Sequence, residues 1–76
     1  MYLYFERSNG EMVLVEDGIT SEEDVMPFIT RDIKRRNPKY KVYYVRIMHL
    51  SYGICYDVGS HTEFYWLKEN KIEEEK

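Results

Sequence analysis

The residues best suited to chemistry are gathered in one run, Tyr56-Asp57-Val58-Gly59-Ser60-His61-Thr62-Glu63-Phe64. This run combines two carboxylates and an imidazole with the hydroxyls of a serine and a threonine. An imidazole beside carboxylates is the usual set for proton transfer or for binding a metal ion. Asp57, His61 and Glu63 are therefore the candidates for an enzymatic or ligand-binding site.

The same run also fits a structural role. Alternate residues of a strand share one face, and the Gly59-Ser60 break interrupts that alternation between Asp57 and His61. Asp57 and Ser60 are suited to capping a turn. His61 and Thr62 are suited to holding a bulge through side-chain to backbone hydrogen bonds. Because the spacing matches no catalytic or metal template, we favour the structural interpretation and expect no catalytic residue, metal or other cofactor.

The elements that would position this run begin with a β-hairpin. Residues 2–7 alternate strand-forming side chains, and Asn9-Gly10 separates them from a second apolar run at 12–15. Asn-Gly is the strongest short-range hairpin signal. With a two-residue loop, Phe5 should face Leu14 and Tyr4 should face Val15. One hairpin face would then hold Leu3, Phe5, Met12 and Leu14.

A helix is expected next. The hydroxyls and acids of 20–24 are typical of a helix start, and apolar residues then recur at helical spacing from Val25 to Ile33. Pro27 is tolerated in a first turn but not in a helix interior. The helix should therefore begin near Asp24, or have a kinked first turn, and it should stop at Asn37-Pro38.

The remaining segments predict strands at 40–50 and 54–58, with a further strand segment at 63–67 after the Gly59-Ser60 break. The predicted fold class is α+β, with the order β-β-α-β-β: a single antiparallel sheet of four strands, or five with the last segment, and one helix packed on one face. Residues 1–68 should form one domain, and 69–76 a charged, frayed tail.

Size and composition limit the class of protein and the cellular compartment that we expect. A domain of 76 residues buries a limited core, and its eight Tyr, three Phe and one Trp leave aromatic surface that favours a homodimer or a partner-binding face. Cys55 has no second cysteine to pair with and is expected to be ordinary strand packing. No apolar run is long enough to span a bilayer. We therefore expect a cytoplasmic protein with no membrane partner.

Charge is distributed unevenly along the chain. Residues 31–46 hold seven cations and one acid, a net charge of +6 within a total of −3, so the remainder carries −9. Such a patch suits a polyanion or the docking of a protein. A nucleic-acid-binding module is thus an alternative function. Its phosphate contacts would be Arg31, Lys34, Arg35, Arg36, Lys39 and Lys41.

Several segments together resemble small, uncharacterised proteins of tailed phages and prophages of Gram-positive bacteria. They are the Tyr-Leu-Tyr-Phe-Glu strand at 2–6, the Asn-Gly hairpin, the helix end Lys34-Arg35-Arg36-Asn37, the segment 42–46 and the Asp57 to Phe64 motif. The resemblance covers residues 2–67 and carries no activity or site residue with it. It implies a setting in which small accessory proteins bind and block larger host proteins, including CRISPR effectors and other antiviral systems.

The sequence therefore predicts a non-enzymatic protein that binds and inhibits a host or antiviral-defence protein stoichiometrically. Aromatic and charged residues of the C-terminal half should line the contact face, although strand parity must send some of them into the core. The candidates are Tyr43, Tyr44, Arg46, Tyr56, His61, Phe64, Tyr65 and Trp66. Nucleic-acid binding, and a ligand or enzymatic site at Asp57, His61 and Glu63, remain the alternatives.

Overall fold

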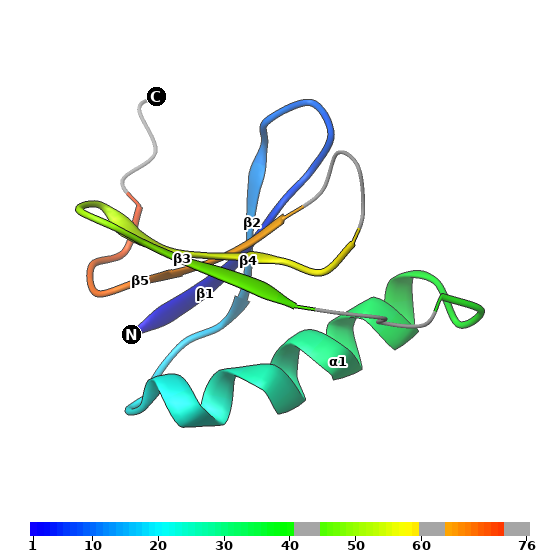
Figure 1. The fold of residues 1–76 in the computed structure, drawn as a ribbon, viewed down its shortest axis with the longest axis horizontal. Helices are drawn as coiled ribbons and strands as arrows, with labels where there is room; N and C mark the ends of the chain where they lie inside the picture. Colours follow the sequence, from blue (N-terminus) through cyan, green and yellow to red (C-terminus); the bar gives the residue numbers. More distant parts are fainter. Residues whose placement is uncertain (41–44, 60–63, 73–76) are drawn as a thin grey trace.

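The chain folds into one antiparallel sheet with a helix across one face (Figure 1). The computed structural model describes residues 1–40, 45–59 and 64–72. Its elements are β1 (Tyr2–Glu6), β2 (Met12–Glu16), the 3₁₀ turn η1 (Glu22–Asp24), α1 (Val25–Arg36), β3 (Arg46–Leu50), β4 (Gly53–Asp57) and β5 (Phe64–Lys68). The strand order is β2-β1-β5-β4-β3. The predicted α+β class is confirmed, with one antiparallel sheet and one helix.

The sheet has five strands, so the five-strand alternative is confirmed and the four-strand order is not. The segment expected as a short addition is the full strand β5, which lies at the centre of the sheet between β1 and β4. The chain reverses between β4 and β5, so that Cys55 pairs with Trp66 and Tyr56 with Tyr65. Of the long strand expected at 40–50, Arg46–Leu50 is β3, while 41–44 lie outside the described residues.

The first hairpin forms as predicted, but its register differs by one residue. Phe5 pairs with Val13 and Tyr4 with Leu14. The loop has three residues because the Gly10 N–H donates to the Arg7 carbonyl at 2.8 Å, and Gly10 adopts a φ of +88°. This is the type I turn with a following left-handed glycine that is common in hairpins. Leu14 therefore points away from the helix, and the predicted face of Leu3, Phe5, Met12 and Leu14 is wrong.

The helix begins and ends where the sequence predicts. Ser21 Oγ accepts the Glu23 N–H at 3.2 Å, which caps the short 3₁₀ turn η1. α1 then starts at Val25, so Pro27 lies in the first turn, where a missing N–H leaves no helical bond unmade. Asn37 ends the helix, with Lys34, Arg35 and Arg36 in the last turn, where cations suit the helix dipole.

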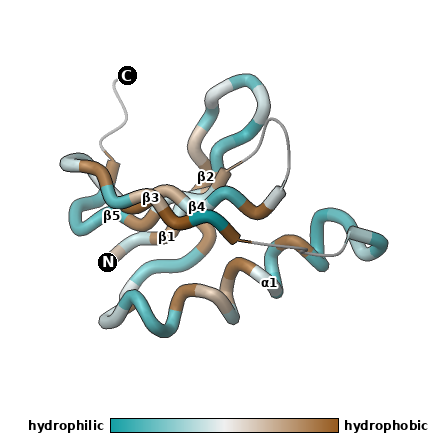
Figure 2. Tube along the Cα trace, in the orientation of Figure 1, coloured by the Kyte–Doolittle hydropathy of each residue, from teal (hydrophilic) through white to brown (hydrophobic). Residues whose placement is uncertain are grey.

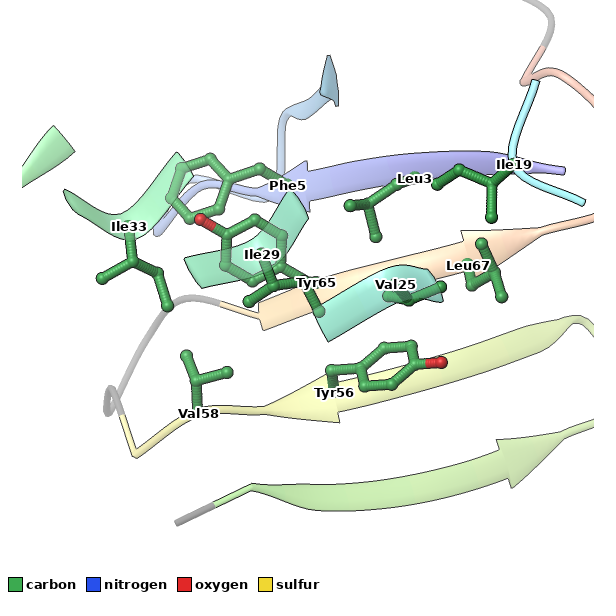
Figure 3. Close-up of a cluster of buried hydrophobic side chains, with 10 residues drawn as sticks. All are labelled: Leu3, Phe5, Ile19, Val25, Ile29, Ile33, Tyr56, Val58, Tyr65 and Leu67. Atoms are coloured by element: carbon green, nitrogen blue, oxygen red, sulfur yellow. The ribbon is translucent and has the colours of Figure 1, made fainter. Parts of the chain in front are cut away.

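The core lies between α1 and the facing side of the sheet (Figure 3). Val25, Ile29 and Ile33 share one side of the helix, whose tube in Figure 2 alternates between apolar and polar segments. Opposite them, the central strands contribute Leu3, Phe5, Tyr56, Tyr65 and Leu67, and the loops before α1 and after β4 contribute Ile19 and Val58. The strand side chains of opposite parity face away from the helix.

Two glycines offer a paired test of the turns. Gly53 has a φ of +151°, and a Cβ at this position would lie 3.0 Å from the Leu67 carbonyl oxygen of the neighbouring strand. Gly10 also has a positive φ, but a Cβ there would meet nothing within 4 Å. We expect Gly10→Ala to cost about 1 kcal/mol of unfolding free energy, from backbone strain alone. Gly53→Ala should cost more, about 2 to 3 kcal/mol, because the β4–β5 pairing must also shift. Urea denaturation measures both, and equal costs would contradict the close approach at Gly53.

Candidate functional site

The sheet face opposite α1, here called the outer face, carries a continuous row of mostly apolar side chains. Paired residues of antiparallel strands share a face. The registers therefore align Leu14, Tyr4, Trp66, Cys55 and Met48 across all five strands. No helix of the described residues packs over this face (Figure 1). The row is thus an apolar strip over which the described residues place no second layer of helices.

Aromatic rings gather around Trp66 on the outer face. Its ring stacks on that of Tyr52, with the centroids 5.6 Å apart and the planes at 29°. The Lys68 ammonium lies 5.3 Å from the Trp66 ring centroid and 5.4 Å from that of Tyr52. Tyr52 is 63% exposed, and Phe64 lies two residues from Trp66 on the same face of β5. We call Tyr52, Phe64, Trp66 and Lys68 the outer aromatic patch.

Two contacts fix this patch in place. The Trp66 indole N–H donates to Glu6 Oε1 at 2.7 Å, which holds the ring against β1. The Lys68 ammonium donates to the Tyr52 carbonyl at 3.1 Å, which ties the β3–β4 turn to β5. Because these groups are already positioned, a partner that docks here loses little side-chain entropy on binding. A fixed aromatic cluster with a cation above it is typical of a binding surface.

The more central part of the outer face is covered by the chain itself. Tyr4 is buried, and its hydroxyl accepts the Ile72 N–H at 2.8 Å, so the segment after β5 reaches back to β1. Cys55 is also buried, and burial, together with the charges of Glu6 and Asp57, raises the pKa of its thiol. A raised pKa means little thiolate and low reactivity. Cys55 is therefore packing, as the sequence suggests.

The structure divides the predicted partner-binding residues between two faces. Arg46, Phe64 and Trp66 lie on the outer face. Tyr56 and Tyr65 point the other way and are 3% and 1% exposed beneath α1, so they are core residues and not part of a contact surface. Successive side chains of a strand point to opposite faces, and Tyr56 and Tyr65 are each next to an outward-facing residue, Cys55 and Trp66. Tyr43, Tyr44 and His61 lie outside the described residues.

A buried carboxylate organises the C-terminal end of α1. Asp32 Oδ2 accepts the Tyr65 hydroxyl and the Arg36 Nε–H, both at 2.6 Å, and Oδ1 accepts from Arg35 Nη2 at 2.9 Å. The Arg36 guanidinium also lies 4.0 Å from the ring centroid of Phe5. The Asp32 side chain is only 4% exposed and Tyr65 is buried, so the bond that joins the helix to β5 is shielded from solvent, whereas the Arg35 side chain is 68% exposed.

The pKa values of this cluster follow from its contacts. Burial raises the pKa of Asp32, but the hydrogen bonds from Tyr65, Arg36 and Arg35 outweigh it and lower the pKa below the ordinary 3.8. Burial, and then the bond to Asp32, raise the pKa of the Tyr65 hydroxyl. At neutral pH the cluster therefore holds a carboxylate and a phenol. Its role is therefore structural: it links α1 to β5 and is not set up to transfer a proton.

The same cluster reduces the positive charge of the basic patch that the sequence predicts for binding nucleic acid. Arg35 and Arg36 both bind Asp32, so part of their charge is compensated inside the protein. Arg31, Lys34 and Lys39 are exposed, and Lys41 lies outside the described residues. Arg31 places its guanidinium 5.6 Å from the Phe28 ring centroid. These remaining cations form a smaller positive surface than the sequence suggests.

A pocket of about 360 Å³ opens beside the cluster. Its walls are mostly apolar and aromatic, with the Arg36 guanidinium as the charged group; they are formed by Phe5, Ile33, Arg36, Asn37, Tyr40, Val58 and Tyr65. The Tyr40 hydroxyl closes one side by donating to the Val58 carbonyl at 2.6 Å. The volume is at the lower end of the range for small-molecule sites.

The structure gives Asp57 a structural role. Its Oδ1 accepts the Gly59 N–H at 3.0 Å, the turn-capping bond that the structural interpretation predicts. His49 lies on the helix-facing side of β3, with Nε2 3.6 Å from Glu22, whereas Asp57 is paired with Arg46 on the outer face. Within residues 1–40, 45–59 and 64–72, no three His, Cys, Asp or Glu residues are close enough to hold a metal. His61 and Glu63 lie outside these ranges.

Two important features were missed from the sequence. Asp32 counted only as the one acid in a basic stretch, although its spacing of three and four residues from Arg35 and Arg36 is a helical ion-pair signal. Tyr52 lies in the turn between β3 and β4, and nothing local in the sequence shows that its ring would stack on Trp66. The long-range contact depends on β5 pairing with β4, which the sequence did not establish.

No protein-family model, curated protein or solved structure matches this chain. None of the helices in the part of the chain that the structure describes is both long enough and apolar enough to cross a membrane.

Proposed function

We propose that this protein acts stoichiometrically, by docking another protein on the outer aromatic patch and inhibiting it. The observation that carries this proposal is the position of the patch. Its exposed and half-buried rings lie on the one sheet face that α1 leaves open. The bond from Trp66 to Glu6, and the bond from Lys68 to the Tyr52 carbonyl in the β3–β4 turn, hold them there. Tyrosine and tryptophan dominate the energetic centres of protein interfaces because they bury large areas with few rotatable bonds.

The charges around the patch indicate the chemistry of the partner. Lys68 lies over the rings, and Arg46 lies on the same face of β3. Glu6 is already engaged by Trp66. A protein that presents an apolar surface with carboxylates beside it would complement this arrangement. The resemblance to small phage proteins supports a host or antiviral-defence protein as the target, in the manner of an anti-CRISPR or other anti-defence inhibitor.

The test is affinity capture from nuclease-treated bacterial lysate, at low and high salt, followed by binding measurements on the purified target. Tyr52→Ala and Phe64→Ala remove patch rings, and Arg31→Ala on the exposed side of α1 is the matched control. We expect the patch variants to bind the target about thirtyfold more weakly, the effect of losing roughly 2 kcal/mol at an interface centre. Arg31→Ala should bind as the wild type does.

Two outcomes would contradict the proposal. One is a target whose affinity is the same for the wild type and both patch variants. The other is capture that disappears after nuclease treatment and falls steeply with salt, which would favour the nucleic-acid-binding alternative through Arg31, Lys34 and Lys39.

A further inference from the structure

The two edges of the sheet are built differently. Strand β2 forms one edge and carries a pairing irregularity opposite Leu3 and Tyr4, with Glu16 at its end and Asp17 following. Bulges and charges of this kind prevent other strands from adding to an edge. Strand β3 forms the other edge and pairs with β4 in unbroken register over all its residues. It has no carboxylate and no proline.

The β3 edge also exposes apolar side chains. Ile47 is 49% exposed and Leu50 is 41% exposed, and they lie on opposite faces of the strand. As an outermost strand, β3 leaves half of its backbone N–H and C=O groups pointing away from the sheet. An unbulged edge with exposed apolar side chains, and with backbone groups that no other described strand pairs with, is a template for pairing with another strand.

We propose that β3 pairs antiparallel with β3 of a second copy of this protein, about a two-fold axis at Met48. Two five-stranded sheets would then form one continuous sheet of ten strands. In this register Met48 lies opposite itself, Ile47 lies opposite His49 of the second copy, and Arg46 lies opposite Leu50 of the second copy. This inference does not depend on the proposed function, because the pairing involves only two copies of this protein and no target.

Side-chain complementarity selects this register. Directly opposed residues must lie on the same face of the sheet, so the two-fold axis must lie between two copies of one residue. When that residue is Met48, every residue of Arg46–Leu50 has a partner. An axis at His49 would oppose two imidazoles, and an axis at Arg46 would oppose two guanidinium groups. An axis at Ile47 or at Leu50 would leave two or more residues of Arg46–Leu50 outside the pairing. The Met48 register opposes no like charges, which is the pattern that stabilises cross-strand pairs.

Analytical ultracentrifugation over a concentration series tests the pairing and its register. We expect the mass of the wild type to rise from 9.3 kDa toward twice that value with concentration. Met48→Glu and Met48→Lys each place two like charges at the axis, so each alone should dimerise at least about tenfold more weakly. Mixed in equal amounts, the two variants should dimerise again. Leu14→Glu, at the middle of the other edge strand β2, should behave as the wild type does.

Several results would overturn the inference. They are a wild type that stays monomeric at every concentration, a dimer that survives both Met48 variants, and a dimer that Leu14→Glu abolishes. Failure of the mixed variants to associate would overturn the Met48 register. Circular dichroism checks that each variant is folded. If the Met48 variants are not, Ile47→Lys replaces them, since its side chain is half exposed and should also weaken the dimer.

Discussion

Replacing Asp32 by alanine is expected to lower the unfolding free energy by about 3 kcal/mol, the upper end of the cost of leaving a buried polar group without its partner. The loss leaves the Tyr65 hydroxyl without its acceptor beneath α1 and the Arg36 guanidinium without its counter-charge. Small domains have total stabilities of about 5 to 15 kcal/mol, so the substitution should remove a large fraction of the total stability. Urea denaturation followed by circular dichroism measures the change.

Asp24→Ala is the matched control. Asp24 is an exposed acid at the start of the same helix, and its side chain makes no capping hydrogen bond. Its replacement should change the unfolding free energy by no more than about 0.5 kcal/mol. Equal stability of the two variants would show that the buried cluster does not hold the helix to the sheet.

The pH dependence of stability follows from the same carboxylate. Because the folded-state pKa of Asp32 lies below its ordinary value of 3.8, ionised Asp32 stabilises the fold at higher pH. This contribution is complete above the unfolded pKa and is lost as the pH falls through the folded value. Asp32→Asn should therefore flatten the acid side of the stability profile below about pH 4. A profile that is unchanged by this substitution would contradict the assignment.

Tyr65→Ala should have an effect of similar size, about 3 to 5 kcal/mol, because it empties the centre of the core. The Tyr65 ring is 1% exposed and lies 5.1 Å from the Phe5 ring, between the sheet and α1. Tyr65→Phe keeps the ring and removes only the hydroxyl that donates to Asp32, so it should cost about 1.5 to 3 kcal/mol. Thermal and urea unfolding by circular dichroism compare the two variants.

Trp66→Ala is the contrasting substitution one residue along the chain. Its ring faces the opposite side of β5 and contacts Tyr52 and Glu6, not the core. We expect this variant to fold cooperatively while losing affinity for the target. Its unfolding is followed by circular dichroism because Trp66 is the only tryptophan. If Trp66→Ala unfolds as readily as Tyr65→Ala, the outer face is structural and the proposed docking surface is wrong.

The fold class was predictable because local signals decide it. Asn9-Gly10 identified the hairpin, and Pro27 with Asn37-Pro38 bounded the helix within a residue or two. The hairpin register was not predictable, since Asn-Gly also serves the three-residue loop in which only Gly10 has a positive φ. A shift of one residue exchanges the two faces, so Leu14 was placed in the wrong layer.

The division of β5 into core and surface was also beyond the sequence. Phe64-Tyr65-Trp66-Leu67 is apolar or aromatic throughout, so it has no alternation of polar and apolar residues to show which side faces the helix. The contact that distinguishes the two sides is with the buried Asp32, whose carboxylate accepts a hydrogen bond from the Tyr65 hydroxyl, 33 residues away in the sequence. Only the pairing of distant strands reveals that contact, and with it the outer aromatic patch.

The central position of β5 has a consequence for biosynthesis. β5 follows the other four strands in the chain, yet it is the one that joins the β1–β2 hairpin to the β3–β4 hairpin. Without Phe64–Lys68 the remaining strands can pair only as two separate hairpins, which leaves the sides of β1 and β4 that receive β5 unpaired. Such open strands are prone to aggregation. A premature stop before β5 would therefore release an aggregation-prone fragment, whereas the complete chain supplies the strand that joins the two halves of the sheet.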